Sequence, residues 1–100
     1  MITGPMCKAA RALVEITRSK LATTAGVDEA VIEAFERRIN VPEAATVEAL
    51  QLALETLGAS FIPERGADGA GVRLKFSQSV TRRLATLENE GGPTATDEVP

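Results

Sequence analysis

One stretch decides the fold of this chain: Leu21-Ala22-Thr23-Thr24-Ala25-Gly26-Val27-Asp28-Glu29-Ala30-Val31-Ile32-Glu33-Ala34-Phe35-Glu36. Its Ala25-Gly26-Val27 predicts a tight turn, because glycine adopts a positive φ at little cost and so ends a helix. Before the turn, Thr17 is a candidate cap for a short helix from Arg18 to about Thr24, with Leu21 and Ala22 facing inward.

After the turn, Asp28 is a candidate cap for a helix over about 29–38. Ile32 and Phe35, with Val31, supply its apolar residues. The stretch therefore predicts two short helices that are joined by a tight turn.

Two longer helices flank this pair. The first should begin near Thr3, which can cap it, and end near Glu15. Asn40-Val41-Pro42 should break the chain, and the next helix should run from about Glu43 to Leu57 and stop at Gly58. The expected apolar stripes are Met6, Ala9, Ala10, Leu13 and Val14 in the first helix, and Val47, Leu50, Leu54 and Leu57 in the second.

The period of the pattern changes after Gly58. Ser60-Phe61-Ile62 reads as a short extended piece, and Val72, Leu74 and Phe76 alternate with charged residues as in a strand with one buried face. The glycine-rich residues 66–71 should close a small antiparallel hairpin.

Beyond the hairpin, a last helix is expected within 77–88. Its stripe of Val80, Leu84 and Leu87 would pack on the domain or form a dimer contact, and Arg82-Arg83 would lie on a solvated face. Residues 89–100 have no apolar stripe and read as a disordered tail. The fold class is thus mostly α: four helices and a two-stranded hairpin over 1–76, an extra helix and a tail.

Composition excludes several classes of function. The chain has 100 residues, a net charge of −3, no His and the single cysteine Cys7. A His–Cys zinc site, a Ser–His–Asp triad and an internal disulfide are therefore excluded. Aromatic residues make up 3%, which argues against a surface that stacks bases. We expect a cytoplasmic protein that is not an enzyme, binds no cofactor or metal and does not enter a membrane.

The pattern resembles the Cro/C1-type (Xre) family of helix-turn-helix regulators over about residues 1–76. Leu21-Ala22, Ala25-Gly26-Val27, Ile32 and Phe35-Glu36 stand where that family places such residues. The opening residues 2–13, Phe61-Ile62-Pro63-Glu64 and Gly71-Val72-Arg73-Leu74 are similar to small alphaproteobacterial members. The resemblance implies a transcription regulator whose third helix reads the DNA major groove. It also implies that Glu36 forms an internal ion pair.

The chain departs from the family at its binding residues. Arg18 stands where the family usually has Gln, and the exposed positions of the third helix are acidic or small, whereas the family has Ser and polar or basic residues there. Glu29 and Glu33 would repel phosphates, although Glu can accept a hydrogen bond from cytosine N4. Glu33 can pair with Arg37 four residues later. The candidate partner- or DNA-binding residues are Arg18, Glu29, Ala30, Glu33, Ala34, Arg37 and Arg38.

Two functions therefore stay open. The favoured one is an antiactivator that binds a transcription activator, for example a LuxR-type quorum-sensing regulator, through a surface complementary to the activator's basic DNA-binding face. The alternative is a Cro/C1-type repressor that binds operator DNA, as a homodimer on paired half-sites.

Overall fold

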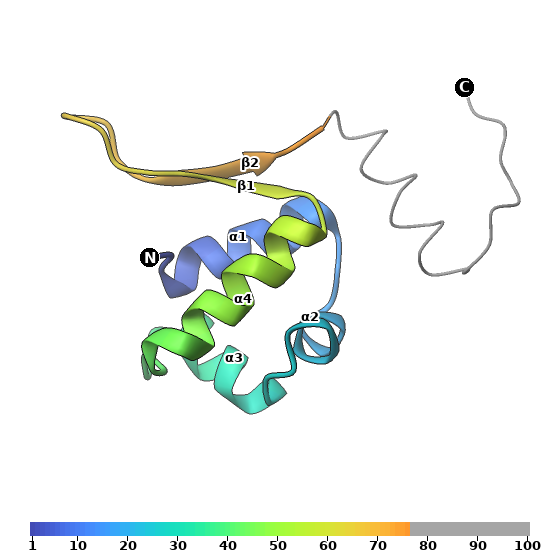
Figure 1. Cartoon of the computed structure of the whole chain (residues 1–100). Coiled ribbons are helices and arrows are strands. Elements are labelled where there is room, and N and C mark those ends of the chain that lie inside the picture. The colour runs from blue at the N-terminus through green and yellow to red at the C-terminus, as the bar shows by residue number, and fades with distance from the viewer. Residues whose placement is uncertain (77–100) are drawn as a thin grey trace, which may run out of the picture.

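Four helices precede a two-stranded hairpin within residues 1–76, the part of the chain that the computed structural model describes (Figure 1). The expected helix over 77–88, with Arg82-Arg83 and the stripe Val80, Leu84 and Leu87, and the tail 89–100 lie outside the described residues. The mostly α fold class with a hairpin is confirmed. The elements are α1 (Gly4–Val14), α2 (Arg18–Ala25), α3 (Glu29–Glu36), α4 (Ala44–Thr56), β1 (Ala59–Ile62) and β2 (Gly71–Leu74).

Three helices begin at the side chains that the sequence predicts as caps. Thr3 Oγ1 accepts a hydrogen bond from the backbone N–H of Met6 at 3.2 Å, and Thr17 Oγ1 accepts one from Lys20 at 3.0 Å. Asp28 Oδ1 accepts one from the N–H of Ala30 at 3.0 Å. Each bond satisfies a backbone donor that has no partner within its own helix.

The same three helices end in one motif, in which the residue after the last turn has a left-handed backbone. That residue is Glu15 after α1 (φ 60°), Gly26 after α2 (φ 70°) and Arg38 after α3 (φ 63°). The residue that follows it donates its N–H to the carbonyl five residues back, which closes the helix end. These bonds are Ile16 to Arg11 (3.1 Å), Val27 to Ala22 (3.1 Å) and Ile39 to Ala34 (2.8 Å).

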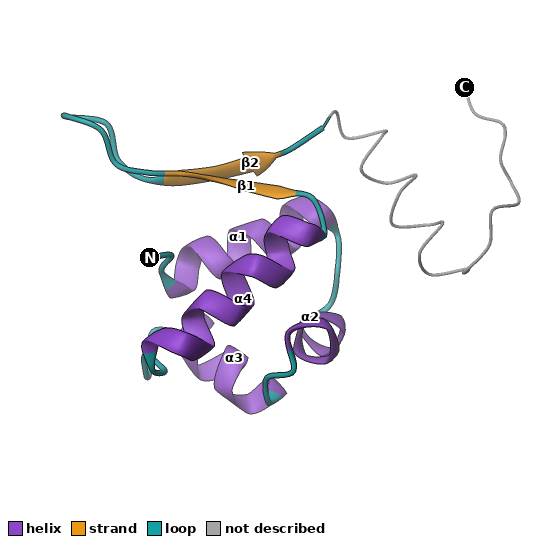
Figure 2. Ribbon diagram, in the orientation of Figure 1, coloured by secondary structure: helices purple, strands orange, loops and turns teal. Residues whose placement is uncertain are grey.

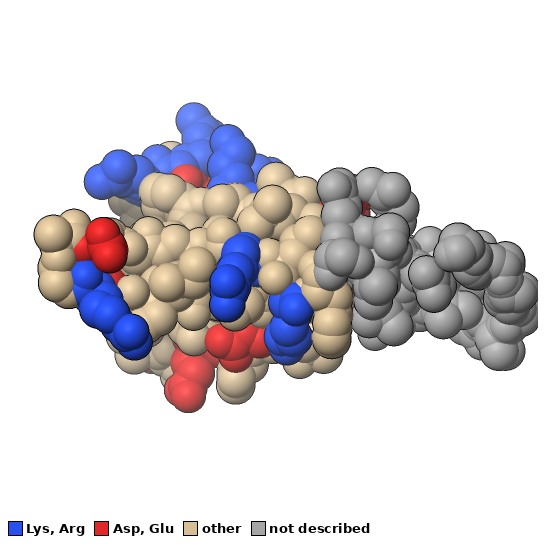
Figure 3. Space-filling view, turned by 90° about the horizontal axis from the view of Figure 1, so that it is seen from above, with Lys and Arg blue, Asp and Glu red and all other residues tan. Residues whose placement is uncertain are grey.

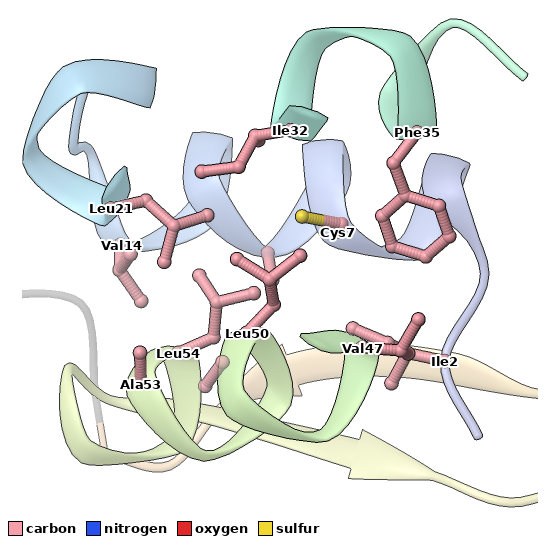
Figure 4. Close-up of a cluster of buried hydrophobic side chains, with 12 residues drawn as sticks. Ile2, Cys7, Val14, Leu21, Ile32, Phe35, Val47, Leu50, Ala53 and Leu54 are labelled. Carbon is pink, nitrogen blue, oxygen red and sulfur yellow. The ribbon is translucent and has the colours of Figure 1, made fainter. Parts of the chain in front are cut away.

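The core lies between α1, α3 and α4, with Leu21 entering from α2 (Figure 4). Ile32, Leu50 and Leu54 are fully buried, Phe35 and Val47 nearly so, and Leu57 packs at the edge, as predicted. Val31 is apolar but exposed.

The predicted apolar stripe of α1 is rotated from the one that the structure buries. Ala9 and Leu13 are exposed, whereas Cys7, Ala10 and Val14 are buried. The inward-facing side of α1 also includes Arg11, which pairs with Glu36 of α3. A prediction that places only apolar residues on the inner side therefore assigns the wrong side of this helix to the core.

The hairpin lies across α1 and α4 (Figure 2). Its strands are antiparallel, with Ala59 opposite Leu74 and Ile62 opposite Gly71. Val72 and Leu74 pack on the core as expected, but the strand ends at Leu74 and Phe76 is half exposed. No helix within residues 1–76 is long and apolar enough to cross a membrane.

Candidate protein-binding surface

A buried carboxylate fixes α3 in the fold. The side chain of Glu36, 1% exposed, receives two hydrogen bonds from Arg11 of α1: Nε to Oε2 at 2.7 Å and Nη2 to Oε1 at 2.8 Å. Arg18 of α2 approaches Glu36 Oε1 at 3.4 Å, and Cys7 Sγ lies 3.5 Å from Oε2. The internal ion pair expected of Glu36 is thus present, and it ties α3 to α1 and α2.

The charges of this cluster shift its titrations. Burial raises the pKa of Glu36, but the hydrogen bonds and positive charge of Arg11, together with hydrogen bonds from Cys7 and Arg18, more than offset this, so the pKa lies below its ordinary value. Burial, followed by the Glu36 charge, raises the pKa of Cys7 to about 12. Glu36 is therefore ionised and Cys7 is a neutral thiol near pH 7.

Arg18 lies apart from the other predicted binding residues. Its side chain is 30% exposed, and its Nε points to Glu36 rather than to the solvent side of α3. Arg18 therefore helps to hold α3 in place.

The solvent side of α3 carries most of the predicted residues. Glu29 and Ala30 are exposed, the Glu33 side chain is 47% exposed, and Ala34 is half-buried one turn after Ala30. The core residues Ile32 and Phe35 point the other way. Up to Ala34, this side displays carboxylates and small apolar side chains.

The two arginines at the end of α3 are placed differently. Arg37 Nη1 lies 3.4 Å from Glu33 Oε2, as the four-residue spacing predicts. Arg38 is exposed and follows the last turn. The cation of Arg37 is thus partly balanced by Glu33.

Sequence reasoning missed three apolar residues beside this surface. Val31 is 36% exposed on α3, and Ile39 and Val41 are 66% and 73% exposed in the segment that follows. The available signal was the pair of branched apolar residues around Asn40, which the sequence analysis treated only as a break between helices. Ile39 and Val41 are therefore two largely exposed branched side chains only two residues apart, directly after α3.

The charges are unevenly distributed along the chain. Residues 1–27 carry four basic side chains and one acidic, whereas residues 28–58 carry two basic and seven acidic. Figure 3, which looks down on the hairpin side, shows a mainly uncharged face with several Lys and Arg side chains, and with Asp and Glu side chains at its lower edge, its left end and near the top. The α3–α4 half of the domain is therefore the acidic one.

Within residues 1–76, no group of three Asp, Glu or Cys side chains is arranged to hold a metal ion. No protein-family model matches the chain, and no curated protein matches its sequence significantly.

Proposed function

We propose that this chain is a transcription regulator with a Cro/C1-type helix-turn-helix fold that acts as an antiactivator through protein–protein contact. The helix pair α2–α3, its tight turn at Gly26 and the packing of α1 and α4 against it support the fold assignment. In this assignment α3 is the recognition helix.

One observation favours a protein over DNA as the binding partner. From Glu29 to Ala34, the exposed side of α3 has two carboxylates and three apolar side chains, and no Lys or Arg. Reading guanine or adenine in the major groove requires hydrogen-bond donors, and approach to phosphates requires positive charge. A surface with neither favours a basic protein partner.

The partner that fits is the DNA-binding face of a transcription activator, such as a LuxR-type quorum-sensing regulator. Such a face is basic because it binds phosphates. An acidic surface that covers it would compete with the promoter and so prevent activation.

Reversal of two charges tests this function. Glu29→Lys/Glu33→Lys should weaken binding to the activator and slow association, because charge complementarity acts mainly on the on-rate. The matched control, Glu48→Lys/Glu64→Lys, makes the same change of net charge on α4 and the hairpin, and should retain binding. Binding is measured by surface plasmon resonance, beside gel shifts with promoter DNA. Unchanged activator binding by the Glu29/Glu33 variant would contradict the proposal.

A second candidate is a sequence-specific repressor. The observation that favours it is Arg38, an exposed cation at the end of α3 within reach of a phosphate if α3 entered the groove. Glu29 or Glu33 would then accept from cytosine N4. In that case the double reversal abolishes a specific gel shift and leaves any protein partner bound.

A further inference from the structure

The end of α3 places an apolar residue directly beside the acidic surface. The N–H groups of Ile39 and Asn40 both donate to the carbonyl of Ala34, at 2.8 and 3.3 Å. This bonding folds the chain back over the last turn of α3, so that Ile39 follows directly on the turn that contains Ala34, and Val31 lies three residues before Ala34 on the same helix. Ile39 is 66% exposed there.

These residues form an apolar centre with an acidic rim. The centre consists of the exposed Val31, Ile39 and Val41 and the half-buried Ala34. The exposed charged residues of the same segment, 28–43, are four acids (Asp28, Glu29, Glu33 and Glu43) and two arginines, of which Arg37 is paired with Glu33 and Arg38 is exposed, so the surroundings are acidic on balance. An apolar centre enclosed by polar residues is the arrangement of protein–protein interfaces, and phosphates gain nothing from it.

We infer that this surface, the α3 patch, binds an amphipathic helix of the partner whose leucine-like stripe is flanked by Lys or Arg. The inference rests on the proposed function and adds to it that the activator presents this helix beside its basic DNA-binding face. Ala30 and Ala34, one turn apart, leave space for a ridge of the incoming helix. The stripe then covers Val31, Ile39 and Val41, while the flanking cations meet Glu29 and Glu33.

Synthetic peptides test the surface even while the partner is unidentified. The probe is a helical peptide of about five turns, with leucines on one face and lysines on both sides. Two control peptides replace either the leucines by serine or the lysines by glutamate. Each is titrated into the full chain, with backbone amide shifts and affinity as readouts. We expect only the lysine–leucine peptide to bind well, and we expect the changes in backbone amide chemical shift to be confined to residues 28–43.

Variants of the chain separate the apolar centre from the charge. Ile39→Ser/Val41→Ser should weaken binding of the lysine–leucine peptide about tenfold, because central apolar contacts dominate interface energy. Ile62→Ser, which changes an exposed apolar residue on the hairpin, is the matched control and should leave binding unchanged. Both residues of the first variant are largely exposed, so the fold should be retained.

Each other outcome has a defined meaning. If the serine peptide binds as well as the lysine–leucine peptide, or Ile39→Ser/Val41→Ser binds normally, the apolar centre does not contribute to binding and the inference fails. The proposed function, which depends on the acidic residues, would not be contradicted by either result. Amide chemical-shift changes centred on the hairpin would also overturn the inference. A sequence-specific gel shift of promoter DNA that is lost in Ile39→Ser/Val41→Ser would show that this surface binds DNA instead. If Glu29→Lys/Glu33→Lys leaves activator binding intact, the proposed function itself fails.

Discussion

Arg11 of α1 holds the carboxylate of Glu36 of α3 with two hydrogen bonds of 2.7 and 2.8 Å. The pair joins residues that are 25 positions apart in the chain. Because the α3 patch begins on the other side of the same helix, this ion pair sets the direction in which the patch faces.

Removal of the Glu36 charge should destabilise the domain. Glu36→Gln leaves the guanidinium of Arg11, 14% exposed, without its counter-ion, which costs about 3 kcal/mol in the free energy of unfolding. Arg18→Gln is the internal control. Its contact is longer and more exposed, so we expect a loss of less than about 1 kcal/mol. Urea unfolding measures both, and equal losses would contradict the ranking.

The same pair predicts a dependence of stability on pH. Folding lowers the pKa of Glu36. The contribution of the ionised carboxylate to the free energy of unfolding is therefore fully present above the unfolded-state pKa and is lost as the pH falls through the folded-state pKa. The difference in unfolding free energy between the parent chain and Glu36→Gln should therefore shrink on acidification. Urea melts from about pH 7 to pH 3 measure it. A difference that grows at low pH would show the opposite shift.

Local features of the fold could be predicted from the sequence. Thr3, Thr17 and Asp28 cap helices through bonds that reach only two or three residues along the chain, so their sequence positions suffice. The buried face of α1 could not be predicted in the same way, because it is set by Arg11 and its partner far along the chain. The helix α3 ends at Glu36, two residues before the expected end. The left-handed residue that closes it is Arg38, so no glycine in the sequence marks this helix end.

The candidate surface likewise has a part that local sequence signals predict and a part that they do not. Glu29, Ala30, Glu33 and Ala34 follow from the cap at Asp28 and the helical period. For Ile39 and Val41 the sequence offers only a weak signal, their position on either side of Asn40, because the exposure of Ile39 depends on how the chain folds back over Ala34.

Cys7 should resist thiol reagents in the folded chain. Its pKa of about 12, raised by burial and by the Glu36 charge, leaves almost no thiolate near pH 8, and thiolate is the reactive form. Labelling by a disulfide reagent should be slow in buffer and fast in concentrated urea, which provides the control. Fast labelling in buffer, with the circular dichroism unchanged, would place the thiol at the surface.

Gly4 should not tolerate a methyl group. A Cβ at this position would overlap the backbone carbonyl oxygen of Phe35, where α1 crosses the end of α3. Gly4→Ala should therefore lower stability by about 1–3 kcal/mol, although alanine favours a helix. Gly69→Ala adds the same methyl in open space and serves as the control. A neutral or stabilising Gly4→Ala, measured by thermal unfolding, would contradict this close approach.

Arg38 offers the opposite case, in which a substitution should stabilise the chain. Its φ of 63° lies in the left-handed region, which disfavours a residue with a Cβ and suits glycine. Arg38→Gly should therefore raise the free energy of unfolding by about 1 kcal/mol. Arg37→Gly removes the same charge at a residue with φ −87°, where glycine adds freedom to the unfolded chain and the exposed pair with Glu33 is lost, so it should lower stability. Equal shifts of the melting temperature in the two variants would mean that charge, and not backbone conformation, limits this helix end.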